Sequence, residues 1–318
     1  MTPRPVAVTL GDPRSIGPEV AVGAAARLSA SGTPTPLLWI VPADLADQLP
    51  DDASHVHLLP PWDGTEVDAG RVSIDAIRAA VAAALDGRVS GVVTGPVHKP
   101  ALHAAGWPTP GQTEMLRELS GVPAVGMLMC AEETRLGAPL RVLLATTHLP
   151  LRDVPMRLDA DLLVEQSTLL EAALRRDWGI ASPRLGVCAF NPHASDGGLF
   201  GDEEARIYEP ALARLRDRGL DVTGPVPADT VFSRALRGEF DAVVAPYHDV
   251  GMAAFKTVSF GTGVNVTVGL PFIRTSPDHG TALDIAGTGR ADASSMYHAL
   301  RLATRLAATR ADSSDTAM

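Results

Sequence analysis

Short apolar segments alternate with amphipathic segments along most of the chain. The apolar segments have the length of buried strands and are predicted at Val6 to Leu10, Leu37 to Val41, Gly91 to Thr94, Val125 to Cys130, Val142 to Thr147, Leu185 to Phe190, Ala242 to Ala245 and Val264 to Val268. Helical spacing of apolar residues predicts helices at Pro18 to Leu28, Ile74 to Asp86, Glu114 to Ser120, Ala160 to Trp178, Asp202 to Arg218, Thr230 to Arg237 and Ala291 to Ala308. Apolar strands that alternate with amphipathic helices are typical of an α/β protein with a mainly parallel sheet.

The length of the chain predicts two lobes. A chain of 318 residues exceeds what one hydrophobic core usually supports. Hydrophobic residues make up 46% of the chain and charged residues 20%, which is the composition of a globular protein with enough apolar surface for a core. We expect the first lobe to combine residues 1–130 with 278–318 and the second to span 131–277.

The charge of the chain narrows the classes of partner. The formal net charge is -10 and the pI is about 5.3, so bulk charge does not attract a phosphate backbone and nucleic acid is not an expected partner.

No apolar run approaches the length needed to span a bilayer. Cys130 and Cys188 lie in apolar runs and predict buried thiols in a reducing compartment. Without a signal-peptide pattern at the N-terminus, we expect a cytoplasmic protein.

Three histidines follow predicted strands. His148 closes the segment that begins at Val142, His193 the one that begins at Leu185, and His248 the one that begins at Ala242. Ligands of open α/β sheets bind outside the carboxyl ends of the strands, so the three imidazoles could converge on one divalent ion. Three protein ligands with open positions are typical of a catalytic metal. The alternative is three ordinary loop histidines.

Carboxylates and cations near these histidines extend the candidate site. Asp249 and Asp229 either orient a ligating ring or lie in a solvated loop or helix cap. Lys256 and Arg274 follow apolar residues, which indicates either a partly buried anion site or a surface lysine with a structural arginine. Residues 111–114 precede a helix and could offer backbone N–H groups to an anion, or Thr113 could be only a cap. Neither a Rossmann fingerprint nor a P-loop is present.

Motifs along nearly the whole chain resemble one enzyme family. They are Thr9-Leu-Gly-Asp-Pro, Gly95-Pro-Val-His-Lys99, Thr146-Thr-His-Leu-Pro-Leu-Arg-Asp-Val-Pro155, Asn191-Pro-His-Ala, Tyr247-His-Asp and Gly263-Val-Asn-Val-Thr-Val-Gly-Leu-Pro-Phe-Ile-Arg-Thr-Ser276. These segments resemble the 4-hydroxythreonine-4-phosphate dehydrogenase family of vitamin B6 biosynthesis. The resemblance implies a two-lobed αβα subunit, similar to isocitrate and isopropylmalate dehydrogenases, and a homodimer whose active site lies in the cleft between the lobes and is completed by the partner subunit.

The resemblance also implies roles for individual residues. His148, His193 and His248 would bind a divalent metal (Zn, Mg, Mn or Co), and Lys256 would be catalytic as well as substrate-binding. The other substrate contacts implied are Gln112, Thr113, Asn265 and Arg274. Residues 278–287 resemble the adenosine-binding turn of the β-decarboxylating dehydrogenases, which would place His279 and Asp284 against NAD or NADP.

Two departures from the family pattern bear on the substrate. The family usually has Gly-His-Thr-Glu where this chain has Gly111-Gln-Thr-Glu114, and Ala-Gly where it has Arg14-Ser15. The leading expectation is NAD- and metal-dependent oxidation, with decarboxylation, of a small anionic substrate: a phosphorylated hydroxy acid such as 4-phosphohydroxy-L-threonine. The alternatives are a cis-dihydrodiol carboxylate dehydrogenase and a threonate or erythronate phosphate dehydrogenase. From other classes, a metal-dependent hydrolase and a non-catalytic anion-binding protein remain alternatives.

Overall fold

The computed structural model describes residues 4–32, 35–108 and 111–315, which form two compact units. Unit 1 comprises Met1–Ala124 and Leu270–Ala311, and unit 2 comprises Val125–Gly269 with the residues from Asp312 onward. The division falls six to eight residues before the boundaries expected from the sequence. The reason is pairing: the strand that begins at Gly126 pairs within unit 2, and the strand that begins at Ile273 pairs within unit 1.

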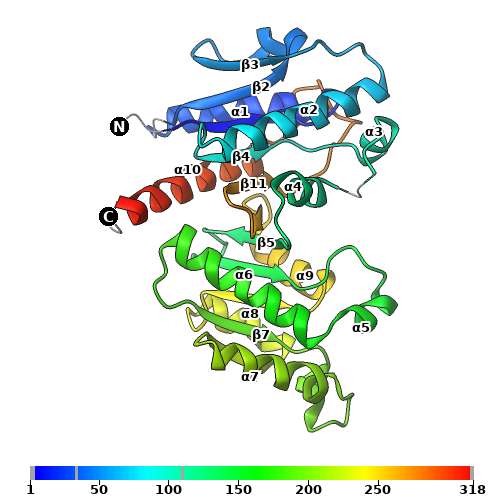
Figure 1. Ribbon diagram of the computed structural model, residues 1–318, viewed down its shortest axis with the longest axis vertical. Coiled ribbons are helices and arrows are strands. Elements are labelled where there is room, and N and C mark those ends of the chain that lie inside the picture. Colours follow the sequence, from blue (N-terminus) through cyan, green and yellow to red (C-terminus); the bar gives the residue numbers. More distant parts are fainter. Residues whose placement is uncertain (1–3, 33–34, 109–110, 316–318) are drawn as a thin grey trace. The chain divides into compact units, whose positions relative to one another are not determined.

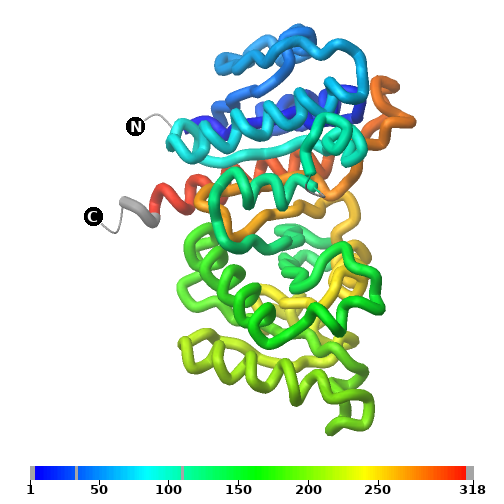
Figure 2. The backbone as a smooth tube through the Cα atoms, turned by 45° about the vertical axis from the view of Figure 1, so that its right-hand side comes forward, coloured from blue at the N-terminus to red at the C-terminus, as the bar shows by residue number. Residues whose placement is uncertain are grey.

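Unit 1 is built on a parallel sheet with the strand order β3-β2-β1-β4-β11. Its strands are β1 (Val6–Thr9), β2 (Leu37–Pro42), β3 (His55–Leu59), β4 (Gly91–Thr94) and β11 (Ile273–Pro277). Its helices are α1 (Gly17–Ala30), η1 (Ala43–Gln48), α2 (Glu66–Leu85), α3 (Lys99–Ala104), α4 (Gln112–Ser120) and α10 (Ser294–Asp315). The chain leaves unit 1 and returns to it, so the orange and red C-terminal segment runs beside the blue and cyan N-terminal one (Figure 2).

Unit 2 is built on a mixed sheet with the order β10-β5-β6-β9-β7-β8. Its strands are β5 (Gly126–Ala131), β6 (Leu140–Leu144), β7 (Arg184–Cys188), β8 (Asp221–Val226), β9 (Ala242–Ala245) and β10 (Val264–Val268). Its helices are η2 (Leu151–Asp153), α5 (Val154–Arg157), α6 (Ala160–Trp178), η3 (Pro192–Asp196), η4 (Glu204–Tyr208), α7 (Glu209–Asp217), α8 (Ala228–Leu236) and α9 (His248–Ser259) (Figure 1). Strands β10, β5 and β6 pair antiparallel, whereas β6, β9, β7 and β8 pair parallel.

Helices cover both faces of the sheet in unit 2. Val142 and Val243 face a buried cluster that includes Phe232 of α8 and Phe255 of α9. On the opposite face, a Cβ atom at Gly126 would meet both Leu143 and Gln166 of α6, so this face packs against α6. The unit is therefore an αβα sandwich in which alternate residues of each central strand are buried on opposite faces.

The sheets position the candidate site because parallel strands end at a common edge. In unit 1, the carboxyl ends of β1, β4 and β11 lie at one edge, and in unit 2 those of β6, β9 and β7 do. Within the described ranges, no helix has both the length and the hydropathy that a membrane crossing requires.

Candidate functional site

Two of the three predicted histidine ligands lie together in unit 2. Strands β6 and β9 pair in register, with Leu144 opposite Ala245. The loops that follow stay side by side: Thr146 Oγ1 donates to the Pro246 carbonyl at 2.8 Å. This arrangement brings the rings of His148 and His248 to a centroid separation of 5.6 Å at an interplanar angle of 42°. The register of two parallel strands, rather than closeness in sequence, forms the pair.

A neighbouring carboxylate orients one of these rings. His248 is the first residue of α9, and its Nδ1 lies 2.7 Å from Oδ1 of Asp249. A carboxylate accepts only, so Nδ1 is the donor and Nε2 is left as the ring atom that can bind a ligand. This arrangement fits a metal-ligating imidazole. Asp229, the other carboxylate considered, is exposed in the first turn of α8.

His193 lies after β7, on the other side of β9. Its loop adjoins the His248 loop, because Phe190 and Tyr247 pack edge to face with centroids 6.3 Å apart. Over the residues that the structure describes, no three His, Cys, Asp or Glu side chains gather closely enough to hold a metal ion. The structure thus pairs His148 with His248 and leaves His193 outside that pair, and the three-histidine metal site stays a prediction.

Lys256 and Asn265 are placed by α9 and β10. Lys256 lies two helical turns after His248 and on the same face of α9, with about 12 Å of helix between the two positions. Asn265 is half-buried on β10, and its buried Oδ1 has no hydrogen-bond partner among the described residues. Burying an amide oxygen without a hydrogen-bond donor destabilises the folded protein, and a ligand that donates a hydrogen bond to this oxygen would remove that cost.

In unit 1, a buried guanidinium lies at the carboxyl edge of the sheet. Arg274 of β11 is 3% exposed, and its Nη2 donates to Thr94 Oγ1 at 2.7 Å and to Gln112 Oε1 at 2.5 Å. Burial lowers the pKa of Arg274 to about 10, because a low-dielectric surrounding disfavours its charged form. Nε2 of Gln112 donates to the Gly95 carbonyl at 2.9 Å. Arg274 and Gln112, both expected as substrate contacts, therefore lie together, while Thr113 occupies the first turn of α4.

Thr94 is a site residue that the sequence analysis did not single out. Its hydroxyl lies within hydrogen-bond distance of both Arg274 and Gln112. The signal was present, since Thr94 is the polar last residue of an apolar strand, the same position that drew attention to the histidines.

A second charged cluster in unit 1 involves the unusual Arg14. Its guanidinium binds the fully buried Asp12 through two bonds, Nε to Oδ1 at 3.1 Å and Nη2 to Oδ2 at 2.8 Å. It also reaches Glu66 at 3.0 Å and lies 3.3 Å from Nδ1 of His98. Hydrogen bonding to Asp12 raises the pKa of Arg14 above its ordinary value. The residue that departs from the family pattern thus engages an acidic side chain within the Gly-Asp-Pro motif.

The expected cofactor residues lie in the turn-rich segment before α10. His279 Nδ1 is 3.0 Å from the Gly280 carbonyl, which only accepts, so Nδ1 is the donor and Nε2 is the other ring nitrogen. Nε2 is buried and has no partner among the described residues. Asp284 is exposed in the same segment. A buried ring nitrogen without a partner and an exposed carboxylate in one segment fit a polar ligand, such as the adenosine part of a dinucleotide.

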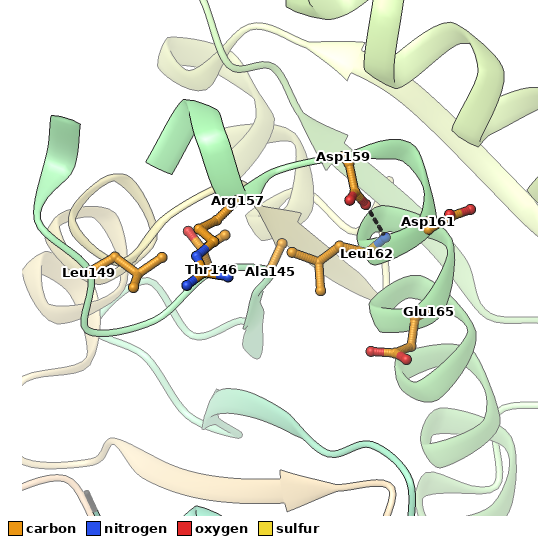
Figure 3. Close-up of a pocket in the computed structure, with 8 residues that line it drawn as sticks. All are labelled: Ala145, Thr146, Leu149, Arg157, Asp159, Asp161, Leu162 and Glu165. Carbon is orange, nitrogen blue, oxygen red and sulfur yellow. Dashed lines mark hydrogen bonds between the residues drawn. The ribbon is translucent and has the colours of Figure 1, made fainter. Parts of the chain in front are cut away.

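A hollow of about 450 Å³ lies beside the His148 loop in unit 2. Thr146, Leu149 and Arg157 line one side, and the start of α6 lines the other with Asp159 and Glu165 (Figure 3). Asp159 caps α6 by accepting from the Leu162 N–H at 2.8 Å. Acidic side chains outnumber the single arginine in the lining, so this hollow does not favour a phosphate.

Comparisons with known proteins agree with the motifs. The family model described as "Pyridoxal phosphate biosynthetic protein PdxA" matches residues 30–303. A 4-hydroxythreonine-4-phosphate dehydrogenase from Burkholderia vietnamiensis is 42% identical over 95% of this chain and 96% of its own length. The crystal structure of the enzyme of that name from Klebsiella pneumoniae has a TM-score of 0.85 and 38% identity, covering 96% of this chain and 99% of that one.

More distant structures bear on the alternatives and on the fold. A terephthalate 1,2-cis-dihydrodiol dehydrogenase from Burkholderia xenovorans has a TM-score of 0.68 and 30% identity, covering 96% of this chain and 98% of that one. An isocitrate dehydrogenase from Methylococcus capsulatus has a TM-score of 0.54 at 14% identity, covering 97% of this chain and 87% of that one, and this likeness concerns the fold alone. Both the expected α/β fold class and the family resemblance are confirmed. The chain belongs to the family of the pyridoxal phosphate biosynthetic protein PdxA, whose named relatives are dehydrogenases that act on a CH–OH group.

Proposed function

We propose that the chain catalyses the NAD- and divalent-metal-dependent oxidation, with decarboxylation, of a phosphorylated hydroxy acid such as 4-phosphohydroxy-L-threonine. Membership of the dehydrogenase family favours this reaction over a metal-dependent hydrolysis. The observation that carries the metal part of the proposal is the pair of imidazoles at the ends of β6 and β9, one of them oriented by Asp249.

His148, His193 and His248 are proposed to hold the ion through ring nitrogens. When bound, the ion would supply a Lewis acid next to the substrate hydroxyl, and NAD or NADP would accept the hydride. Asp249 keeps the proton on Nδ1 of His248, so that Nε2 presents a lone pair. Both His148 and His193 have left-handed backbone conformations, with φ of 47° and 51°, which the surrounding structure must hold in place.

Unit 1 is proposed to supply an anion subsite. Arg274 carries a positive charge at neutral pH even with its lowered pKa, and a buried charge attracts an anion more strongly than an exposed one does. Gln112 Oε1 accepts from one N–H group of that guanidinium and contributes no charge. In the proposed reaction Lys256 and Asn265 contact the substrate, and His279 and Asp284 contact the cofactor.

A second candidate reaction is the oxidation of a cis-dihydrodiol carboxylate. The neutral amide of Gln112 favours it, because a non-phosphorylated substrate carries less negative charge and needs fewer cationic groups. The similarity to the terephthalate dihydrodiol dehydrogenase at 30% identity also supports this candidate.

One experiment separates the candidates. Purified chain is incubated with NAD or NADP and a divalent metal, and NADH or NADPH absorbance is followed with 4-phosphohydroxy-L-threonine, erythronate and threonate phosphates, and cis-dihydrodiol carboxylates. The proposal expects the highest kcat/KM with a phosphorylated acid and loss of turnover with a chelator. A kcat/KM highest for a dihydrodiol selects the second candidate, and hydrolysis with metal but without NAD contradicts both.

We also propose that the chain acts as a homodimer. Large apolar side chains are exposed in unit 2 at Leu151 (63%), Met156 (85%) and Leu199 (72%). Contiguous exposed apolar patches of several hundred Å² mark protein interfaces, and we propose that Leu151 and Met156, in one short segment, belong to such a patch. Size-exclusion chromatography with light scattering should give a molar mass twice that of the chain. The mass of a monomer would contradict this part of the proposal.

A further inference from the structure

The loop that carries His193 has an unusual backbone. His193, Ala194, Ser195 and Asp196 have φ of 51°, 55°, 69° and 45°, so four consecutive residues adopt the left-handed conformation and none of them is glycine. Such residues cost roughly 1–3 kcal/mol each and persist only where their surroundings fix them. Something outside the loop must therefore hold this turn.

Glu204 contacts the chain on both sides of His193. This carboxylate is 4% exposed and accepts hydrogen bonds from residues just before the turn and from Ser195 within it. Oε1 accepts from the backbone N–H groups of Phe190 at 2.9 Å and Asn191 at 2.7 Å. Oε2 accepts from Nδ2 of Asn191 at 2.9 Å and from the hydroxyl of Ser195. One side chain thus ties the residues before His193 to the second residue after it.

The electrostatics agree with a charged, fully engaged carboxylate. Burial alone would raise the pKa of Glu204, but the hydrogen bonds from Asn191 and Ser195 outweigh it and lower the pKa below its ordinary value. Hydrogen bonds to an ionised acceptor are about twice as strong as neutral ones. The bonds therefore stay formed at neutral pH and can offset the strain of the turn.

The neighbouring carboxylate does not have the same reach. Glu203 is half-buried and accepts a hydrogen bond from Nδ2 of Asn191, which precedes the turn, at 2.7 Å. It makes no described contact with Ser195. Glu204 alone of the two acidic residues joins both ends of the turn.

We propose that Glu204 is the positioning residue that fixes the left-handed turn 193–196 and so presents His193 for metal binding. The role of His193 as a ligand rests on the proposed function, whereas the bonds between Glu204 and the turn do not. If fewer chains hold the turn in the competent conformation, the apparent metal affinity falls in proportion to that fraction.

The test compares Glu204→Gln with Glu209→Gln. The glutamine keeps the shape of Glu204 but turns Oε2 into an N–H₂ group that cannot accept from Asn191 or Ser195. Glu209 is exposed at the start of α7 and provides the same chemical change close by. Two readouts are taken: the Kd for Co²⁺ by titration, and the rate of chymotrypsin cleavage after Phe200, an exposed residue that follows the turn, in metal-free protein.

We expect Co²⁺ affinity to fall about 10- to 100-fold in Glu204→Gln, the usual effect of losing a group that orients a metal ligand. Cleavage after Phe200 should accelerate in that variant, and both readouts should match wild type in Glu209→Gln. If Glu204→Gln fails to fold, Ser195→Ala removes one of the four bonds and should weaken Co²⁺ binding by about tenfold.

The outcomes are separable. Unchanged cleavage in Glu204→Gln overturns the claim that Glu204 holds the turn. Faster cleavage with unchanged Co²⁺ affinity shows that the turn is held but does not position a ligand, and this also overturns the proposal. Wild-type protein that binds no Co²⁺ contradicts the proposed metal site instead, and the cleavage comparison then still decides whether Glu204 holds the turn.

Discussion

Replacing Arg14 by alanine should destabilise this chain. Asp12 is 0% exposed and would lose a bidentate partner whose own side chain is only 20% exposed. Removing one partner of a fully buried ion pair costs about 3–5 kcal/mol. Asp12 would keep the backbone N–H of residue 14, now at 2.9 Å from Oδ1, and water could enter the vacated space. We therefore expect a loss of about 2–3 kcal/mol in the free energy of unfolding.

Urea denaturation measures this loss as a lower midpoint at an unchanged m-value. Arg88→Ala is the matched control in unit 1, because Arg88 is 57% exposed and lies 3.4 Å from an Asp86 that is 65% exposed. Arg88→Ala should lower the free energy of unfolding by less than about 0.5 kcal/mol. A double-mutant cycle with Asp12→Asn should show a coupling of about 2 kcal/mol. Equal losses in Arg14→Ala and Arg88→Ala, or additive effects in the cycle, would show that Arg14 does not stabilise the buried Asp12.

Three further predictions concern the site. Asp249→Asn should weaken Co²⁺ binding about 10- to 100-fold by titration, because Asp249 contacts the His248 ring. Asp229→Asn, at a residue that makes no described contact with these rings, should leave the affinity unchanged; equal effects would contradict the orienting role. Gln112→His should lower KM for a phosphorylated substrate about three- to tenfold without changing KM for NAD, since it can add a charged donor beside Arg274; an unchanged KM for that substrate speaks against the anion subsite. Because the pKa of Glu204 is lowered, its contribution to stability is present above the ordinary value of 4.5 and lost as the pH falls below it. The stability difference between wild type and Glu204→Gln, followed by denaturation, should therefore shrink below about pH 4.5, and a constant difference contradicts this sign.

Strands made of continuous apolar residues could be predicted from the sequence, whereas strands that contain glycine, proline or several polar residues could not. All eight predicted strands exist within a few residues, because continuous apolar runs signal burial on both faces. Strand β8 was missed because it contains Gly224 and Pro225, which argue against a strand in any sequence pattern. Strand β11 was missed because its buried residues include Arg274, Thr275 and Ser276, whose polarity hides the strand.

Local signals also misplaced one helix start and missed one helix. The predicted helix at Ile74 begins eight residues earlier, at Glu66, where Thr65 accepts from the Asp68 N–H and caps it. Helix α9 begins at His248 and spans a segment for which apolar spacing predicted no helix. Both cases reflect caps and packing that override apolar spacing.

For the candidate site, sequence positions identified individual residues, whereas strand pairing determined which of them lie together. The positions of His148 and His248 at strand ends could be read from the sequence. The pairing of β6 with β9 could not, because the two strands are far apart in the chain and no local pattern reveals their pairing. The left-handed turn at His193 was not predictable, because it contains none of the glycines that usually mark such backbone. The role of Glu204 follows only from that turn and from the fold that buries the carboxylate beside it.

The most direct test of the proposed metal site is Co²⁺ binding by wild-type chain and by three single variants, His148→Ala, His193→Ala and His248→Ala. We expect saturable binding by wild type, with a Co²⁺ absorption spectrum typical of nitrogen ligands, and loss of that binding in each variant while the thermal unfolding transition is kept. Wild-type Co²⁺ affinity in His193→Ala, the residue that the structure leaves outside the His148–His248 pair, would contradict the proposed metal site.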